Sequence, residues 1–156
     1  MRLVARALRL VLLGLMAALV AAVTLGVVFR YGLGHSLYWA TEVPNFLLVW
    51  IVFLGAAVAW HEGRHIAFTV LTEKLPPAPR LALEIAVCLL LLGFFGFLCV
   101  TGMELVERTM QSRSEALKLP LGYLYLCIPI AAGLMALDTV ATLVSRLRVR
   151  GSRTWR

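Results

Sequence analysis

Four long stretches of the chain contain only uncharged, mostly apolar residues, and each lies between charged side chains. They are Leu10–Phe29, Val43–Trp60, Ile85–Met103 and Leu119–Leu137, each 18 to 20 residues long. A helix rises about 1.5 Å per residue, so about 20 apolar residues cross the roughly 30 Å hydrocarbon core of a bilayer. The pattern predicts an all-α integral membrane protein with four transmembrane helices.

The composition leaves little chain outside these spans. The sequence has 156 residues, of which 62% are hydrophobic, whereas soluble proteins contain about 45–50% apolar residues. We therefore expect residues 1–156 to form a single membrane domain. Because no catalytic domain fits outside the membrane, we predict a protein that is not an enzyme and has no cofactor.

Basic residues are unevenly distributed between the two ends of the spans. One side has Arg2, Arg6, Arg9, Arg64, Lys74, Arg80 and the arginines of the tail 146–156, and the other has Arg30, Arg108, Arg113 and Lys118. Basic residues are enriched on the cytoplasmic side of membranes, so we expect both termini there. This placement accounts for the net charge of +7 without a nucleic-acid partner, and the tail is expected to meet membrane lipids.

The connection between the second and third spans mixes charged and apolar residues from His61 to Leu75, and Pro76, Pro77 and Pro79 follow. Prolines stop helices. We expect a short segment in the cytoplasmic headgroup plane here, with the second helix interrupted near Gly63. In the fourth span, Pro129 predicts a kink.

Small residues recur at helical spacing within the spans. Such faces let two helices approach closely in lipid. The predicted packing residues are Gly14, Ala18, Ala22 and Gly26 in the first span, Gly55 in the second, and Ala132 and Ala136 in the fourth.

The segment from His61 to His65 matches the H-E-x-x-H pattern, in which two histidines hold zinc and a glutamate acts as general base. With Asp138 it forms the alternative interpretation, an intramembrane zinc metalloenzyme. Gly63 within the motif, Arg64 beside the histidines and the small number of spans argue against it. We expect Asp138 to meet Arg146, Arg6 or headgroups instead. A haem anchor is a weaker possibility, because no two histidines face each other in mid-membrane.

No span has a charged residue near its middle. Transporters that act alone place ionisable residues or paired broken helices at the substrate path. The chain is therefore predicted to assist another membrane protein rather than to carry a solute itself.

Several motifs resemble those of one transporter family. They are Arg30-Tyr31, Trp39 and Glu42, the segment 48–56, Gly63-Arg64-His65-Ile66, and Leu119-Pro120 followed by Gly122-Tyr123 and Pro129. In order and position they are similar to those of the small, DctQ-like membrane subunit of tripartite ATP-independent periplasmic (TRAP) transporters. Thr41 and Thr69 depart from the family pattern, in which many members have acidic residues at these positions.

The resemblance implies a scaffold in the bacterial inner membrane that works with two partners. A large permease subunit would hold the sodium and substrate sites, and a periplasmic binding protein would deliver an organic acid. Five residues on the periplasmic side and two on the cytoplasmic side are the candidates for contacting these partners. They are Arg30, Tyr31, Trp39, Glu42 and Arg108, and then Arg64 and His65.

Overall fold

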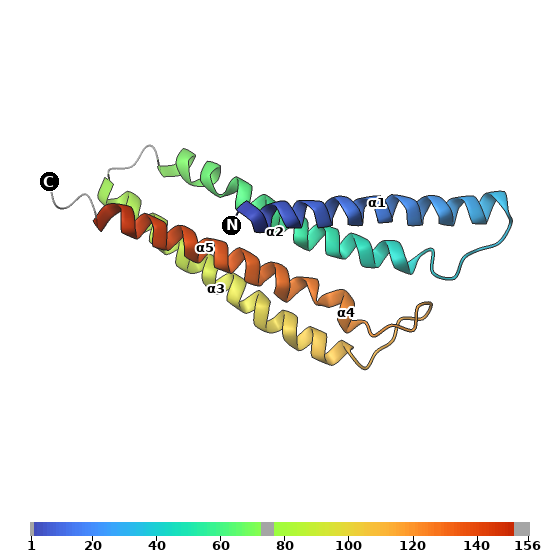
Figure 1. The fold of residues 1–156 in the computed structure, drawn as a ribbon. Coiled ribbons are helices and arrows are strands. Elements are labelled where there is room, and N and C mark those ends of the chain that lie inside the picture. The colour runs from blue at the N-terminus through green and yellow to red at the C-terminus, as the bar shows by residue number, and fades with distance from the viewer. Residues whose placement is uncertain (1, 73–76, 152–156) are drawn as a thin grey trace.

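The computed structural model describes the backbone of residues 2–72 and 77–151, and the side chains of residues 6–63 and 82–144 (Figure 1). The side chains of Arg64 and His65 and the basic tail beyond residue 151 lie outside this part. The predictions made for them are therefore untested.

The described chain is helical. Its elements are α1 (Arg2–Gly32), α2 (Glu42–Thr72), α3 (Pro77–Thr109), α4 (Gly122–Tyr125) and α5 (Cys127–Gly151). Four segments are long and apolar enough to cross a membrane: Arg6–Gly32, Glu42–Gly63, Ala82–Thr109 and Gly122–Val144. The predicted all-α architecture with four spans is confirmed, and each span is longer than its uncharged run because helices continue into flanking polar residues.

The helices form two antiparallel pairs (Figure 1). The first pair is α1 with α2, and the second is α3 with α5, while α2 also packs on α5 and so joins the pairs. The loops 33–41 and 110–121 lie at one end of the bundle, which we call the loop end. The start of α1 and the end of α5 lie away from these loops, and we call this side of the bundle the termini end.

The expected interruption of the second helix near Gly63 is wrong. Residues 61–72 continue α2, and no atom would lie within 4 Å of a Cβ added at Gly63. A glycine inside a helix costs about 1 kcal/mol relative to alanine. The cost of this single glycine is too small to end the helix. The headgroup-plane segment stays a prediction, since residues 73–76 lie outside the described chain.

The interruption expected at Pro129 takes the form of a break between two helices rather than a kink within one. The short helix α4 ends at Tyr125, and α5 begins at Cys127, so that Pro129 lies in the first turn of α5. Proline has no N–H to donate to a carbonyl one turn earlier, and it is tolerated best in a first turn.

The tightest packing lies between α3 and α5. Cys127 and Ala131 of α5 are completely buried, and Phe95 and Val106 of α3 are nearly so. In contrast, only 6% of the residues in an apolar 18-residue window of the α1 span are buried, against 33% in such a window of the span formed by α4 and α5. The first helix therefore contributes little to the core of the chain.

Candidate functional site

Glu42 joins the two helix pairs at the loop end. Its Oε1 accepts a hydrogen bond from the backbone N–H of Ala116 at 2.9 Å, and its Oε2 accepts one from Leu117 at 3.1 Å. Glu42 is the first residue of α2, where the positive end of the helix dipole favours a carboxylate. We call this contact between Glu42 and loop 110–121 the loop clamp.

Loop 110–121 is held together by its own hydrogen bonds. The N–H of Ser114 donates to the carbonyl of Leu119 at 2.9 Å, and the N–H of Leu121 donates to that of Ser112 at 2.9 Å. Ser114 is buried, and its Oγ accepts from the N–H of Leu117 at 3.2 Å. The loop clamp therefore positions a preformed loop rather than a flexible one.

Gly122 brings this loop back onto the end of α3. A Cβ at residue 122 would lie 2.7 Å from Sδ of Met110 and 3.0 Å from the carbonyl oxygen of Val106. Carbon atoms pack at about 3.5–4.0 Å, so only glycine fits without displacing its neighbours. The close contact fixes where α4 begins relative to α3.

The other predicted periplasmic contacts lie at or near the ends of helices at the loop end. Arg30 and Tyr31 are exposed at the end of α1, and the guanidinium of Arg30 lies 5.8 Å from the centre of the Tyr31 ring. Trp39 is half-buried, and Arg108 at the end of α3 is exposed, 3.9 Å from Glu104. Glu42 is the one of these five whose hydrogen bonds, among the described residues, join α2 to loop 110–121. The role of all five as partner contacts stays a prediction.

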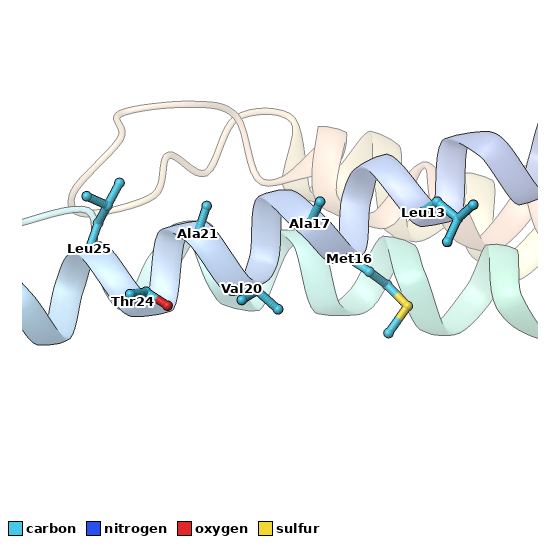
Figure 2. Close-up of a pocket in the computed structure, with 7 residues that line it drawn as sticks. All are labelled: Leu13, Met16, Ala17, Val20, Ala21, Thr24 and Leu25. Carbon is cyan, nitrogen blue, oxygen red and sulfur yellow. The ribbon is translucent and has the colours of Figure 1, made fainter.

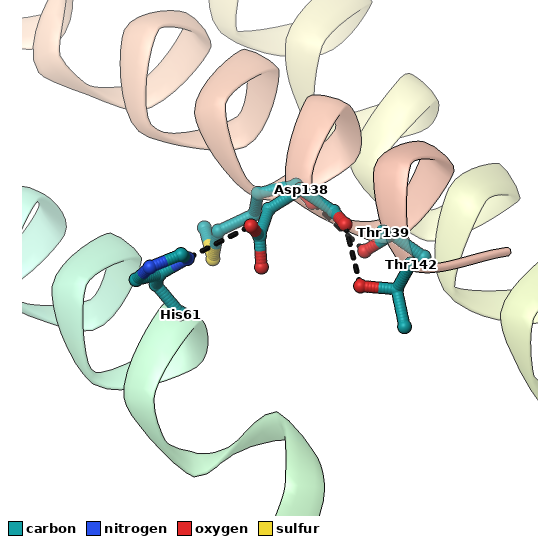
Figure 3. A network of polar contacts seen from close by, with 5 residues as sticks. His61, Asp138, Thr139 and Thr142 are labelled. Atoms are coloured by element: carbon teal, nitrogen blue, oxygen red, sulfur yellow. Dashed lines mark hydrogen bonds and ion pairs between the residues drawn. The ribbon is translucent and has the colours of Figure 1, made fainter. Parts of the chain in front are cut away.

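At the termini end, His61 and Asp138 connect α2 to α5 (Figure 3). Nδ1 of His61 donates to Oδ1 of Asp138 at 2.8 Å. Asp138 is only 4% exposed, and its backbone carbonyl also accepts a hydrogen bond from Thr142. The sequence places the two residues together only in the zinc interpretation. It does not predict their direct hydrogen bond across 77 positions, and Asp138 was expected to meet Arg146, Arg6 or headgroups instead.

The zinc interpretation finds no support in this geometry. His61 is bound to Asp138, and Glu62 forms an ion pair with Arg9, with 2.7 Å between Nη2 and Oε1. Among the side chains that the structure describes, no three histidine, cysteine, aspartate or glutamate residues could share a metal ion. The side chain of His65 is outside the described part.

The predicted packing residues lie in different surroundings. Ala22 and Ala132 are buried, Ala136 is half-buried and Ala18 is exposed. A Cβ at Gly26 would lie 3.1 Å from that of Ala40, whereas additions at Gly14 and Gly55 would meet no atom within 4 Å. Whether these positions form packing faces with partners remains a prediction.

Comparison with known families agrees with this architecture. The family model of the DctQ component of tripartite ATP-independent periplasmic transporters matches residues 19–149, which include all four spans in whole or in part. The chain belongs to this family. It is therefore a multi-pass membrane component of a TRAP transporter.

Individual relatives support the same assignment. A Haemophilus influenzae protein whose name places it among the TRAP transporter small permeases is 28% identical over 143 residues, covering 91% of this chain and 88% of the relative. The ectoine TRAP transporter small permease protein TeaB of Halomonas elongata is 28% identical over 126 residues, which is 80% of this chain and 65% of TeaB.

A third relative is much longer than this chain. The isethionate TRAP transporter permease protein DctMQ of Oleidesulfovibrio alaskensis is 26% identical over 146 residues, covering 88% of this chain but only 23% of the relative. In that fused protein, a unit like this chain is covalently joined to a large permease. The comparison supports a partnership between TRAP small permeases and a large permease subunit.

Proposed function

We propose that this chain is the small permease subunit of a TRAP-type secondary transporter in the bacterial inner membrane. It holds the large permease subunit in place and offers a docking surface to a periplasmic binding protein during sodium-driven uptake of an organic acid. The observation that carries this proposal is the family match over residues 19–149. Sodium coupling and the binding protein come from the family resemblance.

The large permease is proposed to cover the outward side of α1. A shallow apolar groove of about 760 Å³ lies on this helix. Figure 2 shows Ala17 and Ala21 in a row between the larger Leu13 and Leu25, with Met16 and Val20 along the other side of the helix. Small residues flanked by large ones allow close helix contact in lipid. The low burial of the α1 span and the fused DctMQ relative support the assignment.

The binding protein is proposed to dock at the loop end, which would face the periplasm. The loop clamp fixes loop 110–121 against α2, so this surface is preformed. Rigid surfaces bind with a smaller loss of conformational entropy than mobile ones. The proposed contacts are the half-buried Trp39 and the exposed Tyr31 and Arg108, which lie at the same end of the bundle.

The transported acid is proposed to be recognised by other subunits. Two relatives have nearly the same identity to this chain, 28% and 26%, but one is named for ectoine and the other for isethionate. The sequence identity of a relative to this chain therefore does not indicate which solute its transporter carries. This is expected if the solute is bound by another subunit.

Reconstitution tests this function. The chain, its large permease and the binding protein are placed in liposomes, and uptake of candidate acids is measured with and without an inward sodium gradient. We expect uptake only with all three proteins and the gradient. Transport of an organic acid, or peptide cleavage, by this chain alone would refute the proposal.

Variants separate docking from assembly. The double variant Trp39→Ala, Arg108→Ala should weaken uptake by raising the binding-protein concentration needed for half-maximal rate, while the large permease still co-purifies. As a matched control, Glu107→Ala changes another exposed residue near the end of α3 and should leave uptake unchanged. Equal uptake by the double variant and wild type would show that docking occurs elsewhere.

A further inference from the structure

A second pocket lies at the loop end, where α1 ends and α2 begins. Its volume is about 450 Å³, within the range of small-molecule sites. Val23, Val27 and Pro44 are apolar lining residues within the two spans, and Arg30 also lines the pocket, near the end of the first span. The pocket therefore has apolar lining residues within the candidate spans and polar ones near the ends of these spans.

The polar part contains one positive charge. Ser36, Thr41 and Asn45 line it beside Arg30, and no lining residue is acidic. Within the part of the chain that the structure describes, Arg30 forms no ion pair, and its neighbour is the Tyr31 ring at 5.8 Å. Glu42, the nearby carboxylate, is held by the backbone of loop 110–121.

These features select among ligands. Guanidinium groups bind phosphate oxygens with paired hydrogen bonds, and the hydroxyl and amide side chains suit a ligand with hydroxyl groups. A headgroup with an ammonium group would find no carboxylate among the lining residues. An acyl chain is the natural occupant of an apolar part that opens within a span.

We propose that this pocket binds one anionic glycerophospholipid of the phosphatidylglycerol type. Arg30 binds its phosphate, the hydroxyl and amide side chains of Ser36, Thr41 and Asn45 receive its glycerol headgroup, and an acyl chain lies along Val23 and Val27. Binding needs no transport activity, so it goes beyond the proposed function. The lipid would sit at the edge of the docking surface, where it would fill the space between α1 and loop 33–41.

Native mass spectrometry of the full-length chain in mild detergent tests this site. The chain is titrated with phosphatidylglycerol and with phosphatidylethanolamine of identical acyl chains. Wild type should retain phosphatidylglycerol in preference, and Arg30→Gln should weaken its retention about tenfold, the effect of about 1.4 kcal/mol from one charge-assisted contact. Arg30→Lys should restore part of it.

The matched control is Arg113→Gln, which removes an exposed arginine of loop 110–121 outside the pocket. It should leave lipid retention unchanged. An equal loss of lipid retention in both variants would show that retention depends on the overall positive charge of the surface and not on the pocket, which would overturn the proposal. Because Arg30 is exposed, its variants should fold, and unchanged elution and melting would verify this.

Two further results would also overturn it. Displacement of the lipid by millimolar inorganic phosphate or glycerol 3-phosphate would indicate a soluble-anion site, since neither compound has an acyl chain. Unchanged lipid retention in Arg30→Gln, together with lost retention of the binding protein, would make Arg30 a protein contact. Lipid retention is measured on the chain alone, so failed uptake with intact lipid selectivity would count only against the transporter proposal.

Discussion

Gly102 offers a direct test of how α3 and α5 pack. A Cβ at this position would lie 3.0 Å from Cγ2 of Ile128, and 3.1 and 3.3 Å from Cδ and N of Pro129. Carbon atoms prefer about 3.5–4.0 Å, and part of this contact is backbone. Gly102→Ala must therefore push α5 away from α3 where α5 begins, a kind of overpacking that costs about 1–3 kcal/mol.

Gly96→Ala is the matched variant on the same helix, because a Cβ there would meet no atom within 4 Å. Both substitutions gain the same helix propensity, about 1 kcal/mol, so their difference isolates the packing cost. For a chain of this size, about 1–3 kcal/mol corresponds to a Tm difference of about 2–12 °C. Thermal unfolding of the two purified variants in one detergent measures it, and equal Tm values would refute the close α3–α5 contact.

Three other predictions concern the two ends of the bundle. In a double-mutant cycle, His61→Ala and Asp138→Asn should show a coupling free energy of about 1.5–3 kcal/mol, because a buried carboxylate loses its hydrogen-bond donor. Glu42→Gln should speed hydrogen exchange of the two amides in the loop clamp, measured by mass spectrometry of peptides from loop 110–121. In intact cells, a membrane-impermeant maleimide should label His35→Cys, since the loop end is proposed to face the periplasm.

Each of these predictions has a matched control. The Arg9–Glu62 pair is more than half exposed, so its own cycle should give only about 0–1 kcal/mol; equal coupling in both cycles would contradict the special role of the His61–Asp138 pair. Glu107→Gln should leave exchange in the loop unchanged. A cysteine at residue 150 should react only after the cells are opened, and labelling of both sites in intact cells would disprove the proposed orientation.

The spans could be predicted from the sequence because lipid imposes a strict condition on them. Charges are costly in the bilayer interior. A long uncharged run such as Ile85–Met103 therefore predicts a transmembrane helix regardless of the helices that pack against it. Helix ends are less constrained. Beyond Trp60, the chain meets polar surroundings in which several backbone paths are possible, and the single Gly63 is a weak signal against continued helix.

The polar contacts could not be predicted for a different reason. Glu42 was expected at a partner surface from its position, but its hydrogen-bond donors are backbone N–H groups. Every residue except proline has such a group, so the type of side chain does not reveal which ones Glu42 contacts. His61 and Asp138 were each visible as polar residues near a span end. Their pairing depends on how α2 crosses α5, and no local pattern in either helix determines that crossing.

The sparse burial of α1 has a consequence for how sequence change is tolerated. A helix surrounded by lipid accepts almost any apolar side chain, whereas a helix covered by another protein accepts only shapes that match. If the large permease covers the groove between Leu13 and Leu25, substitutions there will be silent in the orphan subunit and harmful in the assembled transporter. The same stretch of helix would then tolerate substitution well in the isolated subunit and poorly in the assembled complex.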